Sequence, residues 1–118
     1  VYSLPRPRKN FSHLKGSTAA VTDQNRRIFF HEIDRVSPTS IAFRHPKIGK
    51  HGWGKNLVKG DSGNPSFLIS GEELVLIETH TSGGAGSGPF YGSPLIQEKL
   101  SAAIITLAPG YQLRFKSL

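Results

Sequence analysis

The sequence contains neither cysteine nor methionine. The absence of cysteine excludes a disulfide framework. Because methionine is absent, Val1 is not a translation start, and we expect a processed product, a trimmed piece or a fragment of a longer protein. No apolar run approaches the length of a membrane span, so we expect no membrane association. The hydrophobic content of 36% allows one compact domain with a modest core.

Acidic residues are also scarce. Fifteen Lys and Arg against eight Asp and Glu give a formal net charge of +7, which makes an anionic partner one option. The basic residues gather at Arg6–Lys9, within a proline-punctuated start, and in the loop at 44–59, which contains Trp53. A basic loop with an aromatic residue can follow phosphates and stack a base of nucleic acid. A solvated basic loop accounts for most of these lysines as well, so nucleic acid is the less favoured partner.

Short β-prone runs separated by polar turns predict an all-β fold. We expect residues 1–16 to form an extended leading segment or linker, and residues 17–118 to form one barrel domain. Six short antiparallel strands are what a Greek-key β-barrel requires. The expected strands are Ser17–Thr22, Ile28–Ile33, Thr39–Phe43, Ser66–Ile69, Leu74–Thr79 and Pro89–Gly92.

A helix is predicted near the C-terminus. Ser93 suits its N-cap, Pro94 suits its first position, and Pro109 with Gly110 ends it. Apolar residues recur at helical spacing between these ends, so we expect the apolar face of the helix to cover the barrel. Beyond the helix, apolar and polar residues alternate over Tyr111–Phe115, which predicts one more strand.

Residues 60–65 read GDSGNP, and this loop is the strongest functional signal in the chain. A serine hydroxyl becomes a useful nucleophile when a base takes its proton and backbone N–H groups stabilise the resulting oxyanion. Gly60 and Ser62 would supply those N–H groups, and Gly63 lets the chain turn sharply after Ser62. We expect Asp61 to hold the turn by pairing with an internal Lys or Arg. The same residue types also form ordinary polar turns between strands.

The loop resembles the nucleophile loop of the trypsin-like (chymotrypsin-fold) serine proteases, whose pattern is GDSGGP. Five of the six positions match, and Asn64 takes the place of the second glycine of the GG pair. The resemblance implies that this chain is the second barrel of such a double-barrel protease, followed by a C-terminal helix. It also implies acyl-enzyme chemistry on Ser62, with Gly60 in the oxyanion hole.

The segment after the loop extends the resemblance. Residues 72–81 read EELVLIETHT, and a glycine-rich stretch, SGGAGSGP, follows at 82–89, as in the strand and pocket wall of these proteases. By that resemblance Thr81 offers backbone hydrogen bonds to substrate, and Gly83 and Asn56 line the specificity pocket. His80 falls where relatives that prefer Glu or Gln carry a pocket histidine, so its N–H would contact an acidic or amide side chain. The alternative is a histidine packed at the end of a strand.

The general base is not evident from the sequence. In the resembling family the base and its aspartate come from a first barrel, and only 61 residues precede Ser62. Asp23 and Asp34 have the positions of turn and strand-end residues. None of the five histidines has the expected context; they are His13, His31, His45, His51 and His80.

Two classes of function therefore stay open. The first is a serine endopeptidase that is incomplete here, with a peptide or protein substrate and a missing N-terminal barrel that carries His and Asp. The second is an inactive trypsin-fold module whose basic surface binds nucleic acid or an acidic protein. Neither reading needs a cofactor or a metal ion. The resemblance favours a secreted or periplasmic bacterial source, or a viral one.

Overall fold

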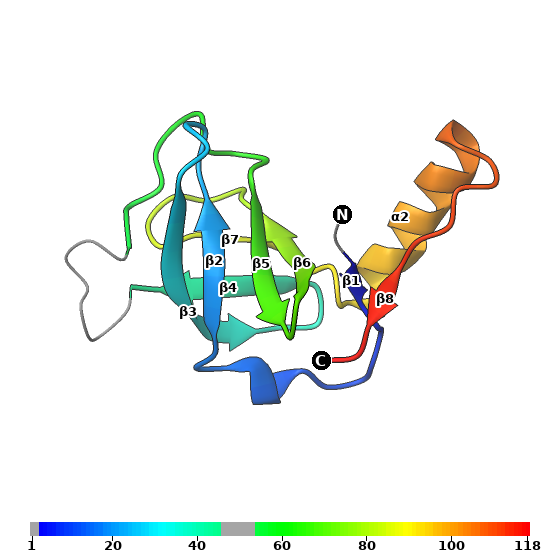
Figure 1. The fold of residues 1–118 in the computed structure, drawn as a ribbon, viewed down its shortest axis with the longest axis horizontal. Coiled ribbons are helices and arrows are strands. Elements are labelled where there is room, and N and C mark those ends of the chain that lie inside the picture. Colours follow the sequence, from blue (N-terminus) through cyan, green and yellow to red (C-terminus); the bar gives the residue numbers. More distant parts are fainter. Residues whose placement is uncertain (1–2, 46–53) are drawn as a thin grey trace.

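A computed structural model of the chain describes residues 3–45 and 54–118 and shows a curled sheet beside one helix (Figure 1). Within these residues six antiparallel strands form the sheet in the order β6-β5-β2-β3-β4-β7. Their bounds are Thr18–Thr22 (β2), Ile28–Val36 (β3), Ser40–Arg44 (β4), Pro65–Ser70 (β5), Glu73–Thr79 (β6) and Ser87–Pro89 (β7). The predicted all-β class, with one C-terminal helix, is confirmed.

The sheet curls until its two edge strands meet. Glu78 of β6 forms an antiparallel bridge with Phe90, just beyond β7, and the N–H of Tyr91 donates to the carbonyl of Ile77 at 3.0 Å. A β-bulge in β3 and another between β5 and β6 add to the bending. Gly88 permits the close approach of β7 to β6, because a Cβ there would overlap the carbonyl oxygen of Thr79.

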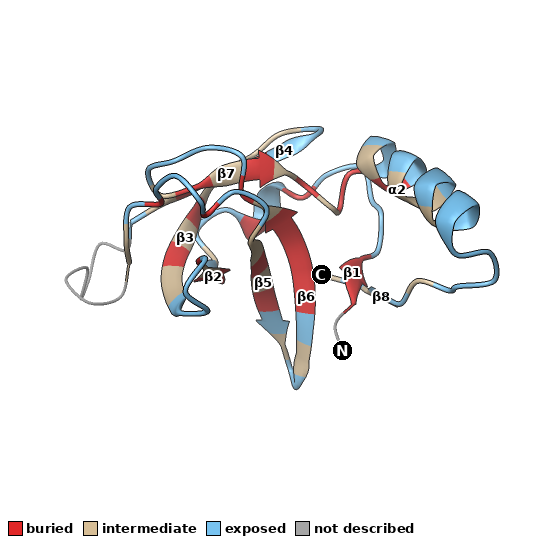
Figure 2. Ribbon diagram, turned by 90° about the horizontal axis from the view of Figure 1, so that it is seen from above, coloured by how far each residue is buried: buried red, intermediate tan, exposed pale blue. Residues whose placement is uncertain are grey.

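The buried residues lie mainly along the strands of the curled sheet, whereas most of α2 is exposed (Figure 2). Buried and less buried residues alternate within β3, β4 and β5, as the two-residue period of a strand predicts, whereas β2 and β6 have continuous buried runs. The buried cluster is Phe11, Leu14, Ala19, Ile33, Ile41, Phe43, Leu68, Ile77 and Phe90.

The leading segment belongs to the packed structure. Leu4–Pro5 form a short strand, β1, and Ser12–Leu14 form a 3₁₀ turn, η1. β1 pairs in parallel with β8, Phe115–Lys116, and Ser3 bridges to Val75 of β6. Residues that were expected to form a linker thus contribute buried side chains, among them Leu4, Phe11 and Leu14.

Two predicted strands differ from the structure. The strand expected at Pro89–Gly92 ends at Pro89, because Phe90 turns into the core. The strand expected at Tyr111–Phe115 is absent except for Phe115, which begins β8; Tyr111 instead donates its N–H to the carbonyl of Ala108 in the turn that ends the helix.

The helix α2 spans Pro94–Leu107, as predicted. The Oγ of Ser93 accepts a hydrogen bond from the N–H of Ile96, which caps the first turn. However, α2 does not cover the barrel: Gln97 is its one buried residue, and the Leu107 side chain is 84% exposed. Apolar residues occur all around this helix, so no single face drives it onto the sheet. Its first turns are anchored instead by the Gln97 amide, which donates to the carbonyls of Pro5 and Tyr91.

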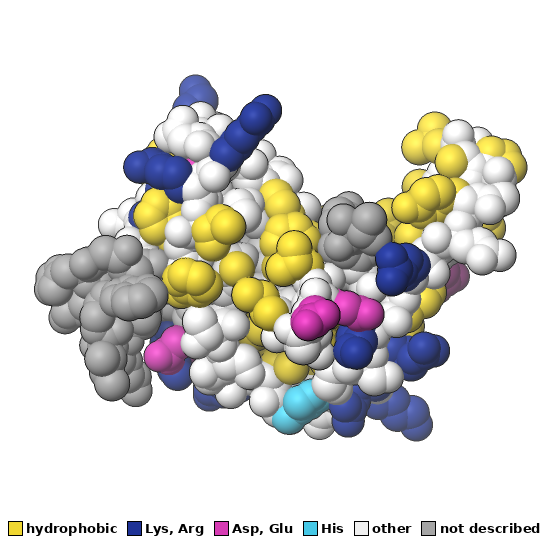
Figure 3. All heavy atoms as spheres, viewed as in Figure 1, with side chains coloured by type: hydrophobic (Ala, Val, Ile, Leu, Met, Phe, Trp, Pro, Cys, Tyr) yellow, Lys and Arg dark blue, Asp and Glu magenta, His cyan; other side chains and the backbone are white. Residues whose placement is uncertain are grey.

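Hydrophobic side chains also gather on the surface over the sheet and along α2 (Figure 3). The exposed ones include Ile28, Ile69, Leu74, Leu95 and Ile105. Within the described residues, no helix is both long and apolar enough to cross a membrane.

Candidate functional site

The GDSGNP loop lies immediately before β5, and two glycines set its shape. Gly60 and Gly63 have φ values of 99° and 86°, in the left-handed region that glycine adopts without strain. A Cβ on Gly60 would also overlap the side-chain amide of Gln24, which donates to the carbonyl of Lys59 at 3.1 Å. The sharp turn therefore presents Ser62 on the surface, where its side chain is exposed.

The hydrogen bonds of the loop leave two donors unused. The N–H groups of Asp61, Gly63 and Asn64 donate to the carbonyls of Val58, His80 and Asp61. Within residues 3–45 and 54–118, the N–H groups of Gly60 and Ser62 and the hydroxyl of Ser62 have no hydrogen-bond partner. The donors expected to stabilise an oxyanion are therefore not consumed by the fold.

Asp61 turns away from Ser62 into the protein, where it is 1% exposed. Its Oδ1 accepts the N–H of Gln24 at 3.1 Å, and its Oδ2 accepts the N–H of Val58 at 2.8 Å. Lys55 Nζ lies 3.2 Å from the same Oδ2. Burial alone would raise the pKa of this carboxyl, but the two backbone donors and the Lys55 charge lower it. The internal cation that holds Asp61 is thus Lys55.

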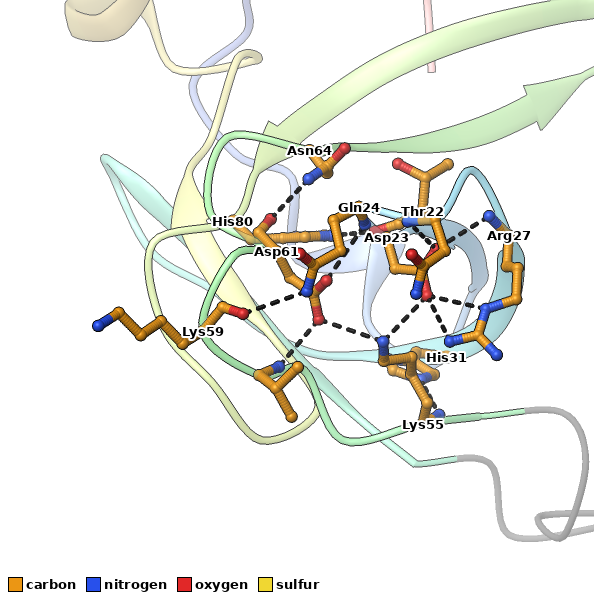
Figure 4. A network of polar contacts seen from close by, with 12 residues as sticks. Thr22, Asp23, Gln24, Arg27, His31, Lys55, Lys59, Asp61, Asn64 and His80 are labelled. Atoms are coloured by element: carbon orange, nitrogen blue, oxygen red, sulfur yellow. Dashed lines mark hydrogen bonds and ion pairs between the residues drawn. The ribbon is translucent and has the colours of Figure 1, made fainter.

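Lys55 joins the loop to the turn between β2 and β3 (Figure 4). Its Nζ also lies 2.9 Å from Oδ2 of the buried Asp23, which Arg27 contacts at 3.0 Å. Burial opposes the charge on Asp23 and on Lys55. The surrounding hydrogen bonds and opposite charges nevertheless hold the pKa of Asp23 far below its usual range and raise the pKa of Lys55.

His80 is buried and holds the other side of the loop. Its Nδ1 lies 2.8 Å from Oε2 of Glu78, and its Nε2 lies 2.8 Å from the carbonyl oxygen of Thr22. Burial would lower the pKa of the imidazole, but the hydrogen bond and charge of Glu78 raise it. A protonated ring donates to both acceptors, so neither N–H is free for a substrate side chain, in contrast to what the resemblance implied. The backbone N–H of His80 donates to the backbone carbonyl of Asn64 at 3.1 Å.

A small cleft of about 150 Å³ opens beside Ser62. Its walls come from two segments, within residues 57–62 and 80–83, which the resemblance had led us to expect in one pocket. The lining residues are Leu57, Val58, Lys59, Asp61, Ser62, His80, Thr81, Ser82 and Gly83. The structure therefore brings Ser62, His80, Thr81 and Gly83 together.

Two of the predicted pocket residues have different surroundings from those expected. Thr81 donates its N–H to the carbonyl of Ser87 at 2.9 Å, so only its carbonyl remains for a peptide. Asn56 does not line the cleft; its exposed side chain contacts Nε2 of His45 at 2.8 Å.

No histidine of the described residues contacts the Ser62 hydroxyl. His31 is buried, accepts the N–H of Lys55 at Nε2 and contacts the carbonyl of Ala85 through Nδ1, and burial lowers its pKa. His13 stacks on Phe11 at the far end of the sheet. His51 and Trp53 lie outside the described residues. Within those residues, no group of three or more His, Cys, Asp or Glu is placed to hold a metal ion.

Sequence reasoning missed three residues of this site: Asp23, Lys55 and Glu78. Glu78 had a usable signal, because it precedes His80 by two residues at the end of a strand, where such residues share a face. Asp23 and Lys55 had none, since their contact with Asp61 arises from tertiary structure. No protein-family model matches this chain, and no curated protein matches it either.

Proposed function

We propose that this chain is the second, Greek-key barrel of a trypsin-like serine endopeptidase, with Ser62 as the nucleophile. One observation carries the proposal: Ser62 is exposed at the edge of a cleft, on a loop that leaves the N–H groups of Gly60 and Ser62 unused. Two unpaired donors on either side of Asp61, on a turn at the edge of a cleft, are groups that an oxyanion could accept from.

The chemistry follows from these groups. The Ser62 hydroxyl attacks a substrate carbonyl while a base takes its proton, and the N–H groups of Gly60 and Ser62 donate to the oxyanion. The base then returns the proton to the amine as the peptide bond breaks and leaves an acyl group on Ser62. Water hydrolyses this ester and regenerates the serine. We assign the base and its orienting aspartate to a first barrel outside these 118 residues.

Lys55 has a positioning role in this scheme. Asp61 follows Gly60 and precedes Ser62, so a tether on its carboxylate fixes the backbone between the two donors. Because Lys55 is already present in the same loop, the donors are held in place by the fold of this domain.

The test is covalent labelling of Ser62 in a protein that includes the region preceding this chain in its gene. A fluorophosphonate probe should label the protein, and Ser62→Ala should abolish the labelling. Ser101→Ala is the control, because it removes a hydroxyl on α2 away from this cleft, and it should keep the labelling. Labelling that survives Ser62→Ala, or a gene whose upstream region lacks a histidine and an aspartate in barrel strands, would overturn the proposal.

An inactive binding module is the second candidate. It is favoured by one observation, that no described residue offers a base to the Ser62 hydroxyl. The net charge of +7 would then suit an acidic partner or nucleic acid. On the face shown in Figure 3, however, the Lys and Arg side chains lie in separate groups and form no continuous stripe. A complete protein that never reacts with the probe would favour this candidate.

A further inference from the structure

The charges around the cleft identify a class of substrate, an inference that rests on the proposed function. Three of the lining residues can carry a charge: Lys59, Asp61 and His80. Asp61 is paired with Lys55, and His80 is paired with Glu78. Both pairs lie inside the protein, so neither presents an unbalanced charge to a bound peptide.

The wider network behind the cleft is balanced as well. Its three carboxylates belong to Asp23, Asp61 and Glu78, and its three cations are those of Arg27, Lys55 and protonated His80. The hydrogen bond and charge of Glu78 raise the pKa of His80, which favours the protonated ring. A buried network without net charge contributes little to the long-range field at the cleft.

Lys59 is the exception. Its side chain is exposed and extends away from the buried network (Figure 4). Within residues 3–45 and 54–118 its ammonium has no ion-pair partner. The backbone of Lys59 is nevertheless fixed, because its carbonyl accepts a hydrogen bond from the Gln24 amide. Val58 and Asp61, close to it in the chain, line the cleft as well. Lys59 therefore combines a fixed backbone at the lining of the cleft with an unpaired ammonium on a flexible side chain.

A hydroxyl-bearing residue lines the same cleft. Ser82 is exposed, and among the described residues no hydrogen bond of its Oγ occurs. A carboxylate accepts hydrogen bonds from both an ammonium and a hydroxyl, whereas a Lys or Arg side chain would meet the Lys59 charge without a counterion. The Asp61 carboxylate does not reverse this argument, since Lys55 and two backbone donors already occupy it.

We propose that the substrate residue whose carbonyl Ser62 attacks is Glu or Asp, and that Lys59 is the residue that determines this specificity. The side chain enters the 150 Å³ cleft and its carboxylate binds the Lys59 ammonium and the Ser82 hydroxyl. His80 serves as a support for the wall and makes no contact with the substrate, because its two ring nitrogens contact Glu78 and Thr22.

The test compares peptides that differ only in Glu, Gln or Lys at that position, using the complete protein. The ratio of kcat/KM for Glu over Gln should be roughly fivefold at low salt, as for a solvent-accessible ion pair, and should fall as salt is added. Lys59→Gln should bring this ratio to about one, and Lys59→Glu should shift the preference to the Lys peptide. Lys99→Gln, on an exposed part of α2, is the control and should keep the ratio.

Failure of this inference can be separated from failure of the proposed function. An uncharged fluorophosphonate reports on the reactivity of Ser62, and its binding does not depend on the charge of Lys59. Labelling together with an unchanged Glu/Gln ratio in Lys59→Gln would overturn the role of Lys59 and leave the nucleophile in place. Absence of Ser62-dependent labelling would overturn the proposed function, and the specificity inference would fall with it.

Discussion

Replacing Lys55 by Met tests whether the buried ion pair between Lys55 and Asp61, which we call the clamp, holds the Ser62 loop in place. Methionine keeps the unbranched stem and removes the charge, so the buried Asp61 loses its cation and keeps two backbone donors. At 3.2 Å and an effective dielectric of 20, the lost attraction to Asp61 is about 5 kcal/mol; Asp23, the other partner of Lys55, keeps Arg27. Because the Lys55 side chain is 16% exposed, water recovers part of this, and we expect a loss of about 3 kcal/mol of unfolding free energy.

Urea unfolding of the 118-residue chain measures this loss. With a slope of about 2 kcal/mol per molar, the midpoint should fall by about 1.5 M at neutral pH. The Asp61 pKa is lowered in the folded protein, so the clamp contributes fully above about pH 4 and is lost as the pH falls through the folded value. The gap between the wild type and Lys55→Met should therefore narrow below pH 4.

Lys99→Met is the matched control, since it removes an exposed lysine of α2 and should shift the midpoint by less than about 0.3 M. The reasoning fails if Lys55→Met shifts the midpoint no more than this control. It also fails if the gap between Lys55→Met and the wild type stays constant down to pH 3.

Two further predictions concern the same loop. Gly60→Ala and Gly63→Ala both force alanine to a positive φ and should each cost about 1 kcal/mol in urea unfolding; Gly60→Ala should cost more, because its Cβ also displaces Gln24. Equal losses would show that the Gln24 contact is unimportant. The raised pKa of His80 stabilises the fold fully below about pH 6.5, and this contribution is lost as the pH rises through the folded value. Stability of the wild type should fall across that range, and His80→Gln should remove the slope; the same slope in the variant would assign it to another group.

Local sequence signals were sufficient where the structure depends on local chemistry. The Ser93 cap and the Pro94 start follow from capping preferences, and the strands near β2, β5 and β6 follow from β-prone runs between polar turns; the structure has all of them. The placement of α2 failed because helical spacing predicts that a helix forms, and the position of its partner surface depends on the rest of the chain. Gln97 decides that position here, through bonds to the carbonyls of Pro5 and Tyr91.

In the candidate site, too, the sequence predicted the local features and missed those that depend on tertiary structure. The loop sequence predicted which backbone groups surround Ser62, but the histidine was expected to face a substrate because a strand-end position alone does not reveal the acceptors around it. Glu78 and the Thr22 carbonyl are those acceptors, and Thr22 lies 58 residues from His80 in the chain. A side chain's hydrogen-bond partners at such separations are set by register and sheet curl.

The clamp has a consequence for how such a site becomes ordered. The cation for Asp61 comes from Lys55, six residues earlier in the same loop, and the second carboxylate that holds Lys55 comes from the adjoining β2–β3 turn. Every member of this network therefore belongs to one sheet and its loops, so the turn between Gly60 and Ser62 is held as soon as the domain folds. In the proposed protease, a partner barrel would supply the base and its aspartate, while the N–H groups of Gly60 and Ser62 would already be in place. The proposal thus accounts for a Ser62 loop that is held by its own domain although, within the described residues, no base contacts the Ser62 hydroxyl.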